Sequence, residues 1–454
     1  MIKIPTKIQL IIDELVDQYE FSDSSERPWI IGFSGGKDST VLLTLVWLCL
    51  RKLKETIPNY RFKRDIHVVC NDTMVENPII SSYVEDVLVF IEKAALEQGF
   101  PITVKKTTPK LDETFWINVI GRGYPVPNNT FRWCTDRLKI RPTSGFLHEQ
   151  IDEKGEAIVL LGTRYAESQN REKTMLKHEV EGSRLSPHNS SPNTKTYAPI
   201  KNLLLEEIWY IINTFESPWG FDNSILFKIY SDASSDDYEC PTVVTTKEHK
   251  SCGQSRFGCW TCTVVKEDKS MSSLIENGQN WMKPLLTFRN ELQQDRNKSE
   301  NRESTRRNGQ LAINEDGMNQ GNYTPEYRYN MLKKLLIIQK EVQIEKPLFN
   351  LITNQELIAI QVIWNRDNYF DKSVSNLYKE IYGDDIYSNN FKTISTLEKS
   401  ILREECQEDK AMYKLIENLI AVQQTKSLLV SNYGLNNDLE KVLESQIDQL
   451  VDED

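Results

Sequence analysis

Short runs of apolar and β-branched residues punctuate the first part of the chain, and each is followed by a stretch with helical spacing. The runs are Trp29–Phe33, Ile66–Cys70, Ile102–Thr107 and the start of Ala157–Arg164. Their length and composition are typical of buried strands. The segments expected to be helical are Ser39–Leu50, Pro78–Glu97, Arg137–Ile151 and Leu203–Phe215. Strands that alternate with helices predict an α/β fold, with a Rossmann-like parallel sheet covered on both faces.

Changes in composition divide the chain into four predicted segments. We expect the α/β domain to cover residues 1–218 and a cysteine-rich module to cover residues 219–292. Residues 293–323 are polar and predict a linker or a mobile loop. Apolar residues recur at helical spacing after Thr324, so residues 324–454 are expected to form an α-helical C-terminal domain. Inside the first domain, the polar stretch Gln169–Thr196 predicts a mobile loop.

The turn between the first strand and its helix has the composition of a phosphate-binding loop. Its residues are Ser34, Gly35, Gly36, Lys37, Asp38 and Ser39. The two glycines let backbone N–H groups approach an anion, and the start of the helix adds unpaired N–H groups and its dipole. Lys37 adds a positive charge beside the bound oxygens. The loop is not a Walker A loop, which has four residues between its glycines.

Two further strand ends carry polar residues. The second strand leads into Asp72, and the fourth leads into Gly162 and Arg164, followed by Glu167 and Arg171. Ligands of parallel sheets bind at the carboxyl ends of the strands. The two arginines are candidates for a bidentate clamp on phosphate or sulfate oxygens, and Glu167 is a candidate for orienting Arg164 or a metal. We therefore predict that these residues line one crevice with the phosphate-binding loop, although any one of the arginines could instead form a surface ion pair.

Charge and hydropathy narrow the class of partner. The formal net charge of −11 argues against a protein that coats nucleic acid by bulk electrostatics, although residues 283–307 carry seven Lys or Arg against four Asp or Glu. The sequence has no secretory signal, and its longest apolar run is far shorter than a bilayer span. We therefore expect a soluble cytoplasmic protein that does not associate with membranes.

Four of the eight cysteines are crowded into one loop-like segment. They are Cys240, Cys252, Cys259 and Cys262, separated by eleven, six and two residues. In a cytosolic chain this crowding favours a metal site over disulfides. Four thiolates can hold structural zinc or an iron–sulfur cluster. Only Cys259 and Cys262 form a Cys-x2-Cys pair, whereas zinc ribbons usually have two such pairs, so the spacing favours a cluster and leaves zinc open.

Cys134 stands apart from that group and has a basic setting. Arg132, Arg137 and Lys139 lie nearby, and a helix is expected to begin after Thr135. Neighbouring cations and a helix N-terminus lower the pKa of a thiol and favour the thiolate. Cys134 is therefore a candidate nucleophile, sulfur carrier or exchangeable cluster ligand. The alternative is a buried or spare thiol with no function.

These motifs together resemble a known superfamily. SGGKDS resembles the PP-loop of ATP pyrophosphatases, which cleave ATP to AMP and pyrophosphate. The order of SGGKDS, Asp72-Thr-x-x-Glu, Arg-Trp-Cys-Thr and Gly-x-Arg-x-x-Glu-Ser-x-x-Arg is similar to that of the phosphoadenylyl-sulfate (PAPS) reductase superfamily. The added cysteine segment and the long C-terminal region resemble more closely the DndC-type sulfurtransferases of bacterial DNA phosphorothioation. The resemblance by motif covers about Trp29 to about Val265.

This resemblance implies an adenine nucleotide α-hydrolase-like fold and a DNA-modifying activity. ATP would be bound by the Ser34–Ser39 loop, with Mg²⁺ held in part by Asp38, and would be cleaved while sulfur replaces a non-bridging oxygen of a DNA phosphate. Lys37 and Arg164 would stabilise the charge that develops. A cysteine desulfurase would donate the sulfur, and other Dnd-type subunits would act with this chain on DNA.

The resemblance also implies roles for the cysteines. Cys240, Cys252, Cys259 and Cys262 would hold a [4Fe-4S] cluster, and Cys134 would be an additional functional cysteine. Three other functions fit part of the pattern: a PAPS-type reductase, a tRNA thiolation enzyme, and a non-catalytic nucleotide-binding scaffold with a zinc site. The cysteine segment and the C-terminal extension argue against the reductase. The Lys-Asp-Ser sequence in the glycine turn argues against the scaffold.

Overall fold

The computed structural model describes residues 4–21, 27–188, 191–233, 257–386, 402–403, 405–406 and 409–427. The chain forms two units, each built from two separate stretches of sequence. Unit 1 comprises Met1–Lys110 and Val126–Gln294, and unit 2 comprises Leu111–Pro125 and Asp295–Asp454. All the predicted site residues that the structure describes belong to unit 1.

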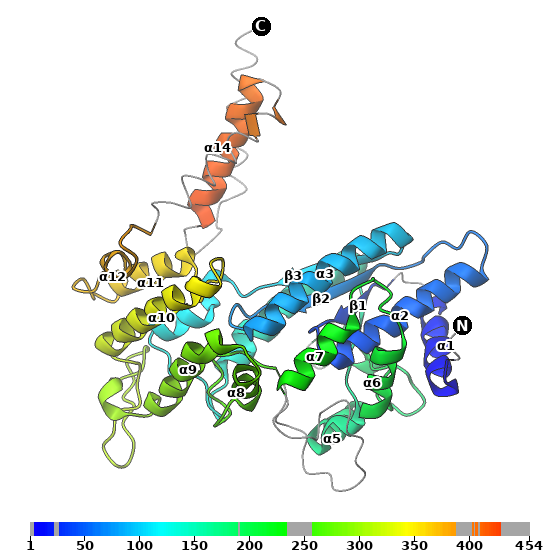
Figure 1. Cartoon of the computed structure of the whole chain (residues 1–454), viewed down its shortest axis with the longest axis horizontal. Coiled ribbons are helices and arrows are strands. Elements are labelled where there is room, and N and C mark those ends of the chain that lie inside the picture. The colour runs from blue at the N-terminus through cyan, green and yellow to red at the C-terminus, as the bar shows by residue number, and fades with distance from the viewer. Residues whose placement is uncertain are drawn as a thin grey trace. The chain divides into compact units, whose positions relative to one another are not determined.

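Unit 1 is built around a six-stranded sheet (Figure 1). Its strands are β1 (Trp29–Gly32), β2 (Ile66–Asn71), β3 (Ile102–Thr107), β4 (Ala157–Leu160), β5 (Ser186–Pro187) and β6 (Thr194–Tyr197). They lie in the order β3-β2-β1-β4-β6-β5, and every neighbouring pair is parallel except β5 with β6. The four strands expected from the sequence are confirmed, and so is the α/β class with a Rossmann-like, mostly parallel sheet. β1 has β2 on one side and β4 on the other, so the strand order reverses at β1. The carboxyl end of β1 is therefore the switch point at which such sheets bind ligands.

The helices of unit 1 alternate with the first strands, as the sequence predicts. They are α1 (Thr6–Glu20), α2 (Lys37–Thr56), α3 (Pro78–Gln98), α4 (Arg141–Lys154), α5 (Gln169–His178), α6 (Leu205–Thr214), α7 (Asn223–Ala233), α8 (Lys269–Glu276) and α9 (Lys283–Asp295). A π-helical turn, Thr135–Ile140, leads into α4. Pro78 lies in the first turn of α3, where a missing N–H removes no helical hydrogen bond. Pro142 lies in the first turn of α4, directly after the π-helical turn.

The two faces of the sheet have separate cores. Trp29 and Ile31 of β1 belong to the larger core, which includes side chains of α1, α2, α3, α6 and α7. Ile30, which lies between them, packs with Phe146 and Leu147 of α4 on the other face. Alternate residues of a strand point to opposite faces, so β1 is buried on both sides. The polar residues of the predicted site are consequently found beyond the strand ends.

Part of the stretch expected to be a mobile loop is regular structure. Gln169–His178 forms α5, and the hydroxyl of Ser168 caps it by accepting a hydrogen bond from the backbone N–H of Arg171 at 3.2 Å. Thr194–Tyr197 forms β6, which pairs in parallel with β4. The loop prediction is wrong for these residues because a short polar strand is recognisable only from the neighbour it pairs with.

The described part of unit 2 is mainly helical, with α10 (Pro325–Glu345), α11 (Asn354–Arg366), α12 (Val374–Tyr382) and α14 (Lys410–Ser427). Its first stretch comes from inside the segment predicted to be the α/β domain. The indole N–H of Trp116 donates to the main-chain oxygen of Leu351 at 2.7 Å, and the indole N–H of Trp364 donates to that of Ile120 at 3.0 Å. No helix in the described part of the chain is long and apolar enough to cross a membrane.

The polar stretch before α10 has more structure than its composition indicates. Arg302 is buried, and its guanidinium donates to the main-chain oxygens of Arg296, Gln320 and Gly321 at 2.9, 2.6 and 2.6 Å. One buried side chain thus fixes the backbone of a segment that has few apolar residues, because a buried guanidinium needs several acceptors.

Candidate functional site

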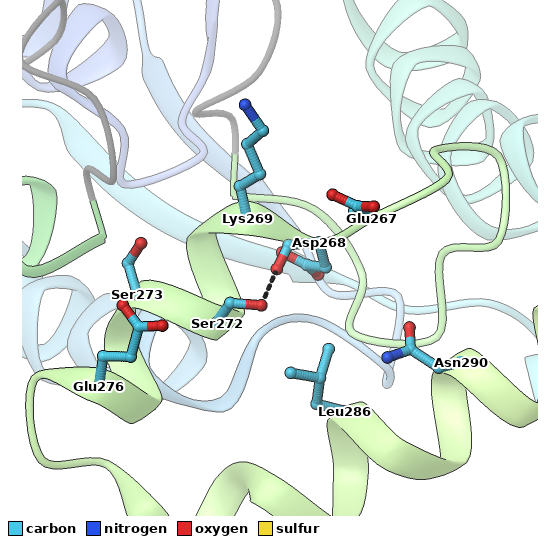
Figure 2. Close-up of a pocket in the computed structure, with 8 residues that line it drawn as sticks. All are labelled: Glu267, Asp268, Lys269, Ser272, Ser273, Glu276, Leu286 and Asn290. Atoms are coloured by element: carbon cyan, nitrogen blue, oxygen red, sulfur yellow. Dashed lines mark hydrogen bonds between the residues drawn. The ribbon is translucent and has the colours of Figure 1, made fainter.

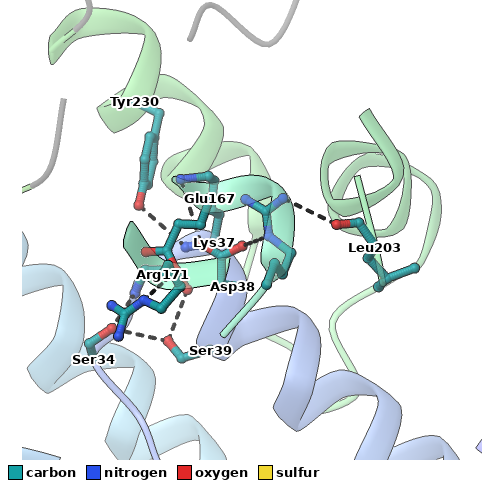
Figure 3. A network of polar contacts seen from close by, with 10 residues as sticks. Ser34, Lys37, Asp38, Ser39, Glu167, Arg171, Leu203 and Tyr230 are labelled. Atoms are coloured by element: carbon teal, nitrogen blue, oxygen red, sulfur yellow. Dashed lines mark hydrogen bonds and ion pairs between the residues drawn. The ribbon is translucent and has the colours of Figure 1, made fainter. Parts of the chain in front are cut away.

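The loop between β1 and α2 is closed by its own side chains (Figure 3). The hydroxyl of Ser39 donates to the main-chain oxygen of Gly36 at 2.9 Å and lies 3.3 Å from the hydroxyl of Ser34. The backbone N–H of Gly36 donates to the Ser34 hydroxyl at 3.4 Å. α2 begins at Lys37, so the unpaired N–H groups of its first turn lie at this loop. The arrangement is suited to binding an anion such as phosphate.

Two glycines of the predicted site are required by packing. Gly35 has a φ of +72°, and a Cβ atom added to it would lie 2.3 Å from a methyl carbon of Val84. A Cβ atom added to Gly162 would lie 3.0 Å from the main-chain carbon and oxygen of Asp38. The end of β4 therefore comes within contact distance of the start of α2 only because residue 162 has no side chain.

Arg164 is held by protein acceptors. Its Nε donates to Asp38 Oδ1 at 2.6 Å, and its Nη1 donates to the main-chain oxygen of Leu203 at 3.2 Å. The Arg164 side chain is 3% exposed, whereas that of Asp38 is 21% exposed. Asp38 Oδ2 lies 3.6 Å from Nζ of Lys37. We interpret Arg164 as the residue that positions Asp38, and through it Lys37, beside the loop.

Glu167 and Arg171 form an ion pair at the start of α5. Arg171 Nε donates to Glu167 Oε2 at 3.0 Å, and the side chain of Arg171 is 40% exposed. Of the two arginines predicted to clamp an anion, Arg171 is therefore the accessible one. Its position after β4 puts it on the same edge of the sheet as the phosphate-binding loop.

The acidic residues after β2 are paired with lysines. Asp72 Oδ1 accepts from the backbone N–H of Met74 at 2.7 Å, and Oδ2 lies 3.0 Å from Nζ of Lys106 on β3. Glu76 Oε1 lies 3.7 Å from Nζ of Lys139. The loop after β2 thus carries carboxylates whose negative charges are balanced by neighbouring elements.

The segment that contains Cys259 and Cys262 is attached to this same loop. Cys259 forms an antiparallel bridge with Glu76. The backbone N–H of Trp260 donates to the main-chain oxygen of Val75 at 3.0 Å, and the N–H of Cys262 donates to that of Cys259 at 2.9 Å. We call residues 259–262 the cysteine turn. Backbone hydrogen bonds fix it beside the end of β2, next to the end of β1.

Lys139 lies within electrostatic range of sulfur and carboxylate groups, although its side chain is 51% exposed. Burial would lower the pKa of its ammonium, but the charges of Cys259, Glu76, Cys134 and Cys262 outweigh burial and raise it. Cys134, which is distant in sequence from the cysteine turn, therefore acts on the same ammonium as Cys259 and Cys262.

The pKa of the Cys134 thiol differs from the sequence-based expectation. Cys134 precedes the π-helical turn Thr135–Ile140, as expected, but burial raises its pKa, and the neighbouring Cys262 raises it further. Thr135 and Lys139 act in the opposite direction without overcoming burial. The prediction of a lowered pKa is wrong because it counted nearby cations and could not count desolvation.

The predicted four-cysteine ligand set is only partly within the described residues. Cys240 and Cys252 lie outside them. Among the residues that the structure describes, no three His, Cys, Asp or Glu side chains are placed to hold a metal ion. The ligand set therefore stays a prediction.

Sequence analysis missed Arg289, which supports the cysteine turn. It is fully buried on α9, and its guanidinium donates to the main-chain oxygens of Cys262 at 2.8 Å, of Lys266 at 2.9 Å and of Val265. No motif signals this role, because the arginine lies on a later helix. Its positive charge is placed next to the segment that carries the two cysteines.

Replacing Arg289 with methionine is expected to lower the free energy of unfolding of unit 1 by about 3 kcal/mol, because three main-chain oxygens lose the buried guanidinium that donates to them. Urea unfolding followed by tryptophan fluorescence measures this. Arg366→Met is the control, since that side chain is 63% exposed, and we expect a change within about 0.5 kcal/mol. Equal stability of the two variants would contradict the supporting role.

A separate cavity of about 290 Å³ lies between α8 and α9 (Figure 2). Its lining residues are Glu267, Asp268, Lys269, Ser272, Ser273, Glu276, Leu286 and Asn290. None of them was predicted to bind nucleotide, sulfur or metal. The cavity therefore does not enter the assignment of function.

Comparison with known proteins establishes the family. Residues 28–265, more than half of the chain, match the phosphoadenosine phosphosulfate reductase domain. The chain belongs to the phosphoadenosine phosphosulfate reductase domain family. The match begins just before β1 and ends just after the cysteine turn, so both parts of the site described above fall within the family domain.

One relative and three solved structures illustrate the range of similar proteins. Uncharacterized protein MJ0066 of Methanocaldococcus jannaschii is 31% identical over 146 residues, which are 32% of this chain and 25% of that protein. This chain thus matches only a quarter of its relative's length.

The solved structures are more distant. The tRNA thiolase NcsA of Methanococcus maripaludis, solved with its [4Fe-4S] cluster, is 13% identical, with coverage of 64% of this chain and 78% of that chain and a TM-score of 0.30. The PAPS reductase of Candida auris is 14% identical (47% and 88% coverage, TM-score 0.27). The FMN adenylyltransferase of Candida glabrata is 14% identical (46% and 54%, TM-score 0.29). The family assignment rests on the domain match.

Membership of the family confirms the broader resemblance seen in the sequence. The chain carries a PAPS reductase-like nucleotide-binding domain. The narrower resemblance to DndC-type sulfurtransferases stays a prediction.

Proposed function

We propose that this chain is an ATP pyrophosphatase that transfers sulfur to a DNA phosphate. The observation that best supports this proposal is that the phosphate-binding loop and the cysteine turn lie at the ends of neighbouring strands. The Ser34–Ser39 loop follows β1, the cysteine turn is hydrogen-bonded to the loop after β2, and β1 pairs directly with β2. An activated phosphate and a sulfur donor must meet at short range, and neighbouring strand ends are consistent with such a meeting.

The first step would use the phosphate-binding loop. A non-bridging oxygen of the acceptor phosphate attacks the α-phosphorus of ATP, the new P–O bond forms, the bond between the α-phosphorus and the bridging oxygen breaks, and pyrophosphate leaves. The N–H groups at the start of α2 and the ammonium of Lys37 stabilise the negative charge that develops. Mg²⁺, held by Asp38 and Asp72, would supply further positive charge at the phosphates.

The second step would deliver sulfur from Cys134. A persulfide on Cys134, loaded by a cysteine desulfurase, attacks the acceptor phosphorus through its terminal sulfur. The P–S bond forms as the P–O bond to AMP breaks, and AMP leaves. A second thiol then attacks the Cys134 sulfur and breaks the S–S bond, so the sulfur stays on the acceptor. The resulting disulfide is reduced by an external dithiol before the next cycle.

The described cysteines fit part of an iron–sulfur site. Cys259 and Cys262 share one hydrogen-bonded turn, and Lys139 and Arg289 bring positive charge to it, which suits ligands that bind as thiolates. With Cys240 and Cys252 they would hold a [4Fe-4S] cluster. When bound, such a cluster supplies a site for sulfide and for electron transfer.

DNA as the acceptor is supported by the added cysteine segment and by the long C-terminal region, which resemble those of DndC-type proteins. On this proposal the other Dnd-type subunits recognise DNA together with this chain. Two enzymes within the same nucleotide chemistry are the alternatives, a PAPS-type reductase and a tRNA thiolation enzyme. A scaffold with a zinc site is the alternative without catalysis.

Replacing Cys134 with serine is expected to preserve pyrophosphate release from ATP and to lower sulfur incorporation by at least about 100-fold, because the sulfur carrier is lost. Pyrophosphate is measured by a coupled assay, and phosphorothioate is measured by mass spectrometry of digested DNA from cells that carry the companion genes. Cys406→Ser, on unit 2, is the matched control and should incorporate sulfur normally. Full incorporation by Cys134→Ser would remove the carrier role.

Three observations separate the alternatives. Pyrophosphate release by the purified protein excludes the scaffold. If tRNA instead of DNA acquires sulfur in the same cells, the thiolation enzyme is correct, and if sulfite appears from PAPS, the reductase is correct.

A further inference from the structure

Tyr230 lies at the phosphate-binding loop although it is distant in sequence. Its hydroxyl accepts a hydrogen bond from the backbone N–H of Lys37 at 3.4 Å, and the Lys37 ammonium lies 5.1 Å from the centre of its ring (Figure 3). A Cβ atom added to Gly36 would lie 3.2 Å from the same hydroxyl. The N–H of Lys37 is the first of α2 and is therefore one of the donors that bind anions at a helix start.

The Tyr230 hydroxyl thus occupies the position of a ligand oxygen. A phosphate oxygen that accepts the same N–H cannot do so while the hydroxyl remains there. The positively charged Lys37 side chain, which would neutralise phosphate, is meanwhile held over the tyrosine ring. Binding of phosphate therefore requires both contacts of Tyr230 with Lys37 to change.

Tyr230 also contacts the approach to the cysteine turn. Its ring packs edge to face on Phe257, with ring centres 5.1 Å apart and planes at 90°. Phe257 is followed by Gly258, whose main-chain oxygen accepts from the N–H of Asn77 at 3.1 Å, and then by Cys259. The cysteine turn is consequently held on one side by the loop after β2 and on the other by an aromatic contact that leads to the phosphate-binding loop.

We propose that Tyr230 is a positioning residue that couples the two sites. Nucleotide phosphate displaces its hydroxyl from Lys37, and the movement of the ring shifts Phe257 and the cysteine turn. The arrangement of the sulfur-bearing residues then depends on whether ATP is bound. This inference rests on the proposed nucleotide site. If it is correct, the sulfur-bearing residues are in position to react only while ATP is bound and a phosphate is being activated.

The first test measures affinity for the α,β-methylene analogue of ATP with Mg²⁺ by calorimetry. Tyr230→Phe removes only the competing hydroxyl, so we expect the dissociation constant to fall by about two- to tenfold. Tyr19→Phe is the matched control, because it also removes a buried hydroxyl. That hydroxyl donates to the main-chain oxygen of Arg64 at 2.9 Å. We expect Tyr19→Phe to leave the dissociation constant unchanged. Unchanged or weaker binding by Tyr230→Phe overturns the displacement.

The second test follows the cysteine turn by fluorine NMR of protein labelled with 5-fluorotryptophan. The Trp260 resonance is assigned by its loss in Trp260→Phe. We expect the analogue to shift this resonance in the wild type and in Tyr19→Phe. In Phe257→Leu we expect the analogue to bind without shifting the resonance. A stationary resonance in wild-type protein that binds the analogue overturns the coupling alone. If the wild type does not bind the analogue, the proposed nucleotide site itself is wrong.

Discussion

Replacing Gly35 with alanine is expected to reduce pyrophosphate release from ATP by about 100-fold. Residue 35 has a left-handed backbone, which costs an alanine about 1–2 kcal/mol, and the added methyl would overlap Val84, which lies 2.3 Å from the Cβ position. Overpacking of this kind costs about 1–3 kcal/mol. Together these terms amount to about 2–5 kcal/mol, a range that includes the ~2.7 kcal/mol that corresponds to 100-fold, and the loop can relieve them only by leaving the anion-binding geometry.

Gly182→Ala is the control for this experiment. Gly182 has a similar φ of +74°, but no atom lies within 4 Å of its Cβ position. We expect a stability loss of about 1 kcal/mol and unchanged pyrophosphate release, measured under the same conditions. If both variants lose activity equally, the close packing at Val84 is not what fixes the loop.

Replacing Arg164 with methionine is expected to destabilise unit 1 by about 3 kcal/mol and to lower pyrophosphate release by at least tenfold. The change leaves the Asp38 carboxylate without the guanidinium that bonds it at 2.6 Å, and removing the buried member of a part-buried pair is costly. Urea unfolding gives the first quantity, and the coupled pyrophosphate assay gives the second.

The Arg171→Met variant tests whether Arg171 binds phosphate or, like Arg164, positions other side chains. The Arg171 side chain is 40% exposed, so loss of its pair with Glu167 should cost less than about 1 kcal/mol of stability. If Arg171 contacts phosphate, its removal should nevertheless weaken ATP binding. A stability loss as large as that of Arg164→Met would show that the two arginines have the same structural role.

The sequence was sufficient to predict those parts of the site whose residues are adjacent in the chain. Six adjacent residues between an apolar strand and an apolar helix specify the loop, and its geometry follows from local turn and helix-start chemistry. The first four strands of the chain could be predicted for the same reason, since each is a short segment in which apolar or β-branched residues predominate. β6 could not, because Thr194–Tyr197 is polar and becomes a strand through its pairing with β4.

The contacts that complete the site depend on tertiary structure. Tyr230 lies on α7, where an aromatic residue would ordinarily indicate only a core position, and nothing in its neighbourhood in sequence points to Lys37. The partner of Arg164 was equally hidden, because a charged side chain near a phosphate loop is as consistent with binding phosphate as with holding Asp38. Burial decides between these uses, and burial is a property of the folded chain.

Unit 2 is built from two separate stretches of sequence, and this has a consequence for biosynthesis. Trp116 and Ile120 are almost completely buried in the finished protein, yet the indole that donates to Ile120 belongs to Trp364, 244 residues later. During translation this apolar stretch must therefore remain exposed until most of the polypeptide has left the ribosome, a situation that favours aggregation and chaperone binding. A protein shortened after residue 294 would keep the stretch permanently without its partners, so expression of the family domain by itself should require removal of residues 111–125 as well.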